Sequence, residues 1–200
     1  RFSDWDGLQL ELVERDEGPP SRWAFGGVPA ERAIKGFGGA VLYSTEPART
    51  MRALEQVLGL ARVGEERGTV RFKAGGELGN LIDVSLRAVE RGRGGAGTVH
   101  HIAWRARDRE DQEAWRIFVE EQGFRPTPVV DRNYFTSIYF REAGEILFEI
   151  ATDPPGFLRD EPFAALGERL MLPDWLEDRR GRIETRLPPL EVRVLKEDRE

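Results

Sequence analysis

An internal repeat is the feature that most constrains the fold of this chain. Residues 39–42 align with residues 101–104, and residues 59–63 align with residues 123–127, with a two-residue adjustment between the matched stretches. The period of roughly 60 residues is long enough for one supersecondary unit per copy. The sequence therefore predicts a molecule built from copies of one such unit.

The first copy has the pattern of a βαβββ unit. A strand is predicted over 39–42, and a helix over 46–58, where apolar residues recur every three or four positions. Alternating or continuous apolar runs over 69–72 and 81–86 predict further strands.

The second copy repeats this order. Strand patterns occupy 98–104, 127–131, 134–140 and 145–152, and a helix with one apolar face is predicted over 109–122. We therefore predict an α+β fold of repeated βαβββ modules with curled mixed sheets.

The repeat also predicts how the chain is divided. Phe2, Leu8, Leu10 and Glu11 fall on Phe140, Ile146, Phe148 and Glu149 at one constant offset, so the chain is expected to begin partway through a module. The predicted parts are the final strand of an otherwise missing module (1–16), a linker (17–34), a first module (35–90), a second module (91–156) and a carboxy-terminal extension with short helical signals at 162–171 and 175–186 (157–200).

Composition excludes several classes of function. With 40% hydrophobic and 33% charged residues, 200 residues can bury a substantial core. The net charge of −6 provides no basic surface for nucleic acid, and no apolar run is long enough for a membrane span or shaped like a signal peptide. The chain has no cysteine, which fits a reducing compartment, so a cytoplasmic location is expected.

The two histidines, His100 and His101, are adjacent and lie in a predicted strand. Successive side chains of a strand point to opposite faces, so only one histidine is expected to face a given site. Glu149 lies between two apolar residues of the last strand, where a buried carboxylate needs a partner. Imidazole and carboxylate suit Fe(II), Mn(II) or Zn(II), although a hydrogen-bonded strand histidine and a sheet-edge carboxylate explain the same pattern.

Two further side chains precede Glu149 in a cluster with Asn133 and Tyr134. A guanidinium at Arg132 and a phenol at Tyr139 could polarise oxygen or hold a ring hydroxyl beside a metal. The alternative is an ordinary aromatic strand with a solvated arginine.

Three long motifs, at 97–105, 131–142 and 146–156, resemble those of the ring-cleaving dioxygenases of the vicinal oxygen chelate superfamily, and most closely the hydroquinone-cleaving subgroup. Residues 166–177 and 186–190 resemble the carboxy-terminal extension of the same proteins.

The resemblance implies the glyoxalase/extradiol dioxygenase fold and a mononuclear Fe(II) centre, for which Mn(II) is also suitable. His101 and Glu149 would be metal ligands, and His100, Arg132 and Tyr139 would orient or protonate the substrate. The implied reaction opens an aromatic diol such as a hydroquinone or catechol with O2.

The chain departs from the subgroup at one ligand. The subgroup takes its other histidine from the first strand of the first module, but this chain has no third histidine, and Gly38 and Gly39 stand where the second copy has its pair. An amino-terminally truncated chain with an incomplete site is therefore expected, completed by a homo-oligomer or by the missing amino-terminal module. A glyoxalase-type metal-dependent isomerase and a non-catalytic small-molecule binding module remain alternatives.

Overall fold

The computed structural model describes residues 1–21 and 27–189. Part of the predicted linker, residues 22–26, and the end of the predicted carboxy-terminal extension, residues 190–200, lie outside this described part.

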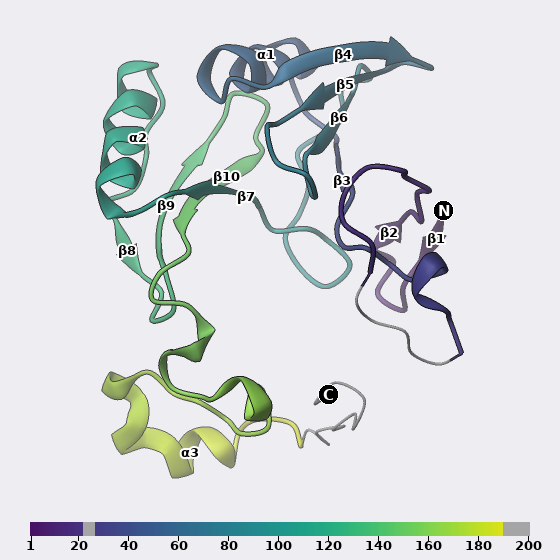
Figure 1. The fold of residues 1–200 in the computed structure, drawn as a ribbon. Coiled ribbons are helices and arrows are strands. Elements are labelled where there is room, and N and C mark those ends of the chain that lie inside the picture. Colours follow the sequence, from purple (N-terminus) through teal and green to yellow (C-terminus); the bar gives the residue numbers. More distant parts are fainter. Residues whose placement is uncertain (22–26, 190–200) are drawn as a thin grey trace.

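The first repeat copy forms a four-stranded mixed sheet in the order β3-β6-β5-β4 (Figure 1). The first and last strands of this copy, β3 and β6, pair in parallel, and the other pairs are antiparallel. Its elements are β3 (Gly39–Leu42), α1 (Pro47–Arg52), a π-helical turn (Ala53–Val57), β4 (Ala61–Glu66), β5 (Thr69–Lys73) and β6 (Leu81–Ser85).

The second copy repeats this topology in a sheet of order β7-β10-β9-β8, with β7 and β10 parallel. Its elements are β7 (Ile102–Ala106), α2 (Arg109–Glu121), β8 (Val130–Asp131), β9 (Thr136–Arg141) and β10 (Leu147–Thr152). The predicted fold class is confirmed, whereas the proposed boundaries between modules stay a prediction.

Helix α2 covers one face of the second sheet. It begins where the Asp108 carboxylate accepts a hydrogen bond from the backbone N–H of Asp111, at 2.8 Å, and it ends before Gly123, which adopts a φ of 85°. Its buried Val119 belongs to the same apolar cluster as Ile138 and Ile150 of the sheet. Because side chains alternate along a strand, the neighbours Tyr139 and Glu149 lie on the opposite face.

The short opening hairpin has the same register as the hairpin that joins β9 and β10. Strands β1 (Phe2–Ser3) and β2 (Gln9–Leu10) pair Phe2 with Leu10, the positions matched in sequence to Phe140 and Phe148, which also pair.

The turns of the two hairpins are also built alike. The Asp4 carboxylate accepts hydrogen bonds from the backbone N–H groups two and four residues later, as the Glu142 carboxylate does in its own turn. The sequence match over residues 1–11 therefore corresponds to a shared structure.

The turn between β9 and β10 is anchored to the first copy. The Glu142 carboxylate is 2% exposed and accepts a hydrogen bond from the Thr50 hydroxyl at 3.0 Å, and Thr50 contacts Ser44 at 2.7 Å. A Cβ added at Gly144 would lie 1.9 Å from Ser44 Oγ, so this junction requires glycine.

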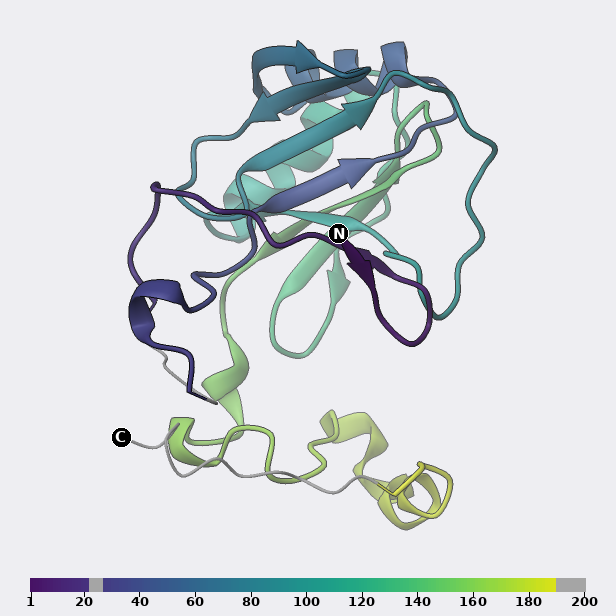
Figure 2. The ribbon, with the colours of Figure 1, turned by 90° about the vertical axis from the view of Figure 1, so that its right-hand side faces the viewer.

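After β10 the chain leaves the sheets and continues as an arm that lies below them in the views of Figures 1 and 2. The predicted helix at 162–171 is wrong in extent, because only a 3-10 turn at Phe163–Ala165 forms there. The signal at 175–186 matches a helical stretch, made of a 3-10 turn at Asp174–Arg179 and the short helix α3 (Arg180–Glu184). Further 3-10 turns occupy Ala30–Arg32 and Phe157–Arg159. None of the helices in the described ranges has the length and apolar character needed to cross a membrane.

Candidate metal and substrate site

The adjacent histidines precede β7 instead of lying within it, because the strand begins at Ile102. Without strand geometry their side chains are not forced to opposite faces, and His100 Nδ1 lies 2.8 Å from His101 Nδ1. His101 contacts Glu149 directly and His100 contacts His101, so the expectation that only one histidine faces the site stays a prediction.

Glu149 is the buried centre of the cluster and is only 3% exposed. Its Oε2 lies 2.6 Å from His101 Nε2, and its Oε1 accepts hydrogen bonds from the hydroxyls of Tyr139, at 2.8 Å, and Ser137. Strand pairing explains this geometry, because Tyr139 lies opposite Glu149 in the ladder and Ser137 lies two residues before Tyr139 on the same face. Three donors around one carboxylate offset the cost of burying its charge.

Arg132 extends the cluster toward solvent. Its Nε and Nη2 atoms donate to the Tyr139 hydroxyl oxygen at 3.1 and 3.0 Å, and its guanidinium carbon lies 5.1 Å from the centre of the Tyr139 ring. A continuous path of hydrogen bonds therefore leads from Arg132 through Tyr139 to Glu149 and His101.

The structure thus brings together all five side chains named from the sequence: His100, His101, Arg132, Tyr139 and Glu149. Their donor chemistry fits a divalent metal of the Fe(II) or Mn(II) type, since an imidazole nitrogen and a carboxylate oxygen lie next to each other. Within residues 1–21 and 27–189, no three His, Asp or Glu side chains form a complete metal-binding group. In this cluster one imidazole nitrogen and one carboxylate oxygen, those of His101 and Glu149, are in contact.

The first sheet has a different pair at the matching positions. Asp83 of β6 pairs with Arg71 of β5 in the ladder, and two hydrogen bonds of 2.8 and 2.7 Å join their side chains. Gly39 takes the place of His101, and a Cβ there would lie 2.0 Å from the Leu81 carbonyl oxygen. This half of the repeat holds an ion pair and has no room for a ligand side chain.

Tyr134 and Asn133, which cluster with Arg132 in the sequence, face other partners. The Tyr134 hydroxyl donates to Asp160 at the start of the arm, at 2.9 Å, and burial, followed by the neighbouring Asp160 carboxylate, raises the pKa of this phenol. Asn133 adopts a positive φ of 69° in the turn before β9. Both residues shape the turn and the arm.

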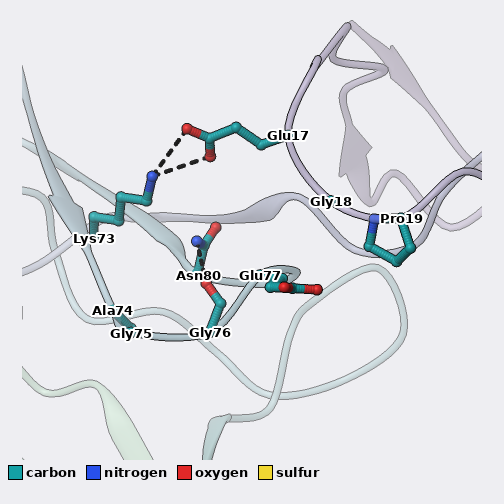
Figure 3. Close-up of a pocket in the computed structure, with 9 residues that line it drawn as sticks. All are labelled: Glu17, Gly18, Pro19, Lys73, Ala74, Gly75, Gly76, Glu77 and Asn80. Atoms are coloured by element: carbon teal, nitrogen blue, oxygen red, sulfur yellow. Dashed lines mark hydrogen bonds and ion pairs between the residues drawn. The ribbon is translucent and has the colours of Figure 1, made fainter.

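A cavity of about 710 Å³ lies elsewhere, between the chain before β3 and the loop after β5 (Figure 3). Lys73 Nζ contacts both Glu17 carboxylate oxygens there at 3.0 Å, and the hydrogen bonds from Lys73 and Arg15 lower the pKa of Glu17. The lining includes none of the five predicted site residues.

Ser137 was missed by sequence reasoning. A serine inside an apolar strand carries no chemical signal of its own, but its position two residues before Tyr139 places it on the same strand face. That spacing, combined with the pairing of the two strands, could have identified it.

Comparison with known proteins decides the family. The sequence pattern of the Glyoxalase/Bleomycin resistance protein/Dioxygenase superfamily matches residues 36–158. The chain belongs to this superfamily. A solved domain of the superfamily from Frankia sp. EAN1pec shares its fold at a TM-score of 0.54 and 15% identity, covering 62% of this chain and 96% of that one.

Several superfamily members are much more similar in sequence. "Putative ring-cleaving dioxygenase MhqO" of Bacillus subtilis is 56% identical over 97% of this chain and 62% of its own length. "Chlorohydroquinone/hydroquinone 1,2-dioxygenase" of Sphingobium indicum is 31% identical over 86% of this chain and 55% of its own length. A crystal structure described as a putative dioxygenase from Bacillus subtilis matches with a TM-score of 0.92 at 56% identity, covering 97% of this chain and 63% of that one. This chain therefore spans less than two thirds of the length of these relatives.

Proposed function

We propose that this protein contributes to an Fe(II)-dependent, extradiol-type ring-cleaving dioxygenase that opens an aromatic diol, such as a hydroquinone or catechol, with O2. The observation that carries the proposal is the buried Glu149 carboxylate 2.6 Å from His101, with the Arg132–Tyr139 pair beside it. The names of the relatives agree with this reaction type.

His101 Nε2 and one oxygen of Glu149 would hold the metal, which is Fe(II) or, on ligand type, Mn(II). When bound, such a metal supplies the Lewis acidity and redox chemistry that ring opening with O2 requires. The remaining ligands would be water and a side chain from a second copy or from an amino-terminal module. A cytoplasmic location for the whole protein stays a prediction.

The other side chains would bind and orient the ring. His100 is exposed and shares a hydrogen bond with His101, so its imidazole can take a proton from a ring hydroxyl held nearby. Arg132 is also exposed, and its guanidinium can steady a negatively charged ring oxygen. Tyr139 fixes the position of Arg132 because its hydroxyl oxygen accepts two of the guanidinium hydrogen bonds.

The first test is iron content after anaerobic Fe(II) loading and desalting. We expect wild-type protein to retain iron and Glu149→Ala to lose it, because the variant removes one of the two protein ligands. Asp83→Ala is the matched control, since Asp83 occupies the corresponding position of the other sheet and pairs with Arg71. Equal iron retention by wild type and Glu149→Ala would overturn the proposal.

The second test is O2 consumption with a hydroquinone by the iron-loaded protein together with its completing partner. Ring cleavage consumes O2, whereas a glyoxalase-type isomerisation does not. Turnover without O2 uptake would exclude the dioxygenase reaction.

A further inference from the structure

The two oxygens of the Glu149 carboxylate have different surroundings. Oε1 accepts hydrogen bonds from the Ser137 and Tyr139 hydroxyls, whereas Oε2 has the His101 imidazole as its neighbour. Each carboxylate oxygen has two lone pairs, so two hydroxyl donors occupy Oε1 fully. Oε2 keeps one lone pair available beside His101.

We propose that Ser137 is a positioning residue which, together with Tyr139, reserves Oε1 for hydrogen bonds, so that Glu149 offers a metal the single oxygen Oε2. This inference rests on the proposed metal-binding function of Glu149. It adds a positioning residue, Ser137, to that site.

Burial makes the position of Ser137 well defined. The residue is completely buried on β9, where it precedes the buried Ile138 and lies opposite Ala151 of β10. Tyr139 is held from its other side by Arg132, so its own orientation is fixed independently of Ser137. Of the two hydroxyl donors at Oε1, the Ser137 hydroxyl is therefore the one whose position is set by the backbone of the sheet.

Without Ser137, the second lone pair of Oε1 would be unoccupied in a buried site. Tyr139 alone would then hold Oε1, so the carboxylate could rotate more readily and present either oxygen to His101 or to a metal. The loss of a hydrogen-bond partner of a metal ligand typically weakens metal affinity by about 10- to 100-fold.

The experiment uses Ser137→Ala, with Ser137→Thr to restore a hydroxyl. Ser44→Ala is the matched control, because Ser44 is another fully buried serine with a hydroxyl partner, Thr50, in the other half of the repeat. Circular dichroism and urea unfolding verify that each variant is folded.

The first measurement needs no metal. The chain has only two histidines, so ring ¹⁵N labelling of histidine gives two side chains to follow, and His100→Asn assigns them. At one fixed pH, we expect the His101 ring ¹⁵N shifts to change in Ser137→Ala, because Glu149 Oε2 is no longer held against Nε2. The shifts should stay as in wild type in Ser44→Ala and return toward wild type in Ser137→Thr.

The second measurement is the affinity for Mn(II), followed by electron paramagnetic resonance of the free ion. We expect about tenfold weaker binding in Ser137→Ala and near wild-type binding in Ser44→Ala. An unchanged His101 spectrum in folded Ser137→Ala would overturn the inference, as would unchanged Mn(II) affinity.

The two proposals fail in different ways. If the histidine spectrum changes as expected but neither wild type nor Ser44→Ala binds Mn(II), the metal-binding function is contradicted, whereas the positioning of Glu149 by Ser137 is supported. If wild type binds Mn(II) and Ser137→Ala matches it, the function is supported and the role of Ser137 is contradicted.

Discussion

At the scale of single residues, Gln112 shows how a polar side chain can stabilise an apolar interface. It is completely buried on α2, and its amide nitrogen donates to the backbone carbonyls of Thr136 and Ile150 at 2.7 and 2.8 Å. Its amide oxygen accepts a hydrogen bond from the Thr136 hydroxyl at 2.8 Å. Gln112 therefore ties the helix to the two strands that carry Tyr139 and Glu149.

We expect Gln112→Leu to lower the free energy of unfolding by about 2 kcal/mol, because it leaves buried carbonyl oxygens without these donors. Urea denaturation followed by circular dichroism measures the effect. Gln122→Leu at the exposed end of the same helix is the control, and it should change stability by less than about 0.5 kcal/mol. Equal effects of both substitutions would contradict the role given to the buried amide.

The sequence identified the residues of the candidate site, but it did not predict all the contacts between them. His101 and Glu149 stand out because the histidines are so few and because a carboxylate among apolar strand residues needs a partner. The contact between the histidines could not be predicted, because it depends on β7 beginning one residue after His101. Ser137 was missed because its importance comes from its contact with Glu149, which lies on the paired strand and twelve residues later in the chain.

At the scale of elements, the turn between β9 and β10 makes polar contacts between the two copies, in addition to the apolar core that they share. Gly144 packs there against the hydroxyls of Ser44 and Thr50, and its carbonyl accepts a hydrogen bond from the backbone N–H of Thr45 at 3.1 Å. Since β10 carries Glu149, this contact connects the candidate site to the first sheet.

Gly144→Ala is expected to destabilise the protein by about 1 to 3 kcal/mol, because its Cβ would meet Thr50 Oγ1 at 2.2 Å as well as Ser44. Thermal and urea unfolding provide the measurement. The control is Gly64→Ala in β4, where no atom lies within 4 Å of an added Cβ. A Gly144→Ala protein as stable as the Gly64→Ala protein would show that the turn adjusts without cost.

The sequence predicted regular elements well where they contribute to the core. Helix α2 ends within a residue of its predicted position, since its cap and its stop glycine are local signals. The helical signal at 162–171 fails because most of its apolar residues are exposed, as at Phe163 and Leu166. Without a core to pack against, a short amphipathic segment has little to stabilise it as a helix.

At the scale of the whole molecule, the arm is fastened to the second sheet mainly near Tyr134. The Tyr134 ring stacks on Phe157 with centroids 5.0 Å apart, its hydroxyl donates to Asp160, and its carbonyl accepts from the backbone N–H of Gly156 at 2.8 Å. Ionisation of the Tyr134 phenol would place its negative charge beside the negatively charged carboxylate of Asp160.

Stability should therefore fall at alkaline pH. The folded-state pKa of Tyr134 is raised above its ordinary value of 10.0, so its stabilising contribution is fully present below that value and is lost as the pH rises through the folded-state pKa. Urea midpoints measured from pH 8 upward should fall less steeply in Tyr134→Phe than in wild type. Tyr43→Phe, which changes an exposed phenol, should keep the wild-type slope, and a wild-type slope in Tyr134→Phe would contradict the prediction.

The close approach of Gly39 to Leu81 makes the difference between the two sheets hard to reverse. Any L-amino acid at this position would collide with the Leu81 carbonyl oxygen, 2.0 Å from the added Cβ. A single codon change therefore cannot restore a histidine to the first copy without moving its backbone. A protein engineer who wants a second centre in the first sheet must therefore first separate β3 from β6.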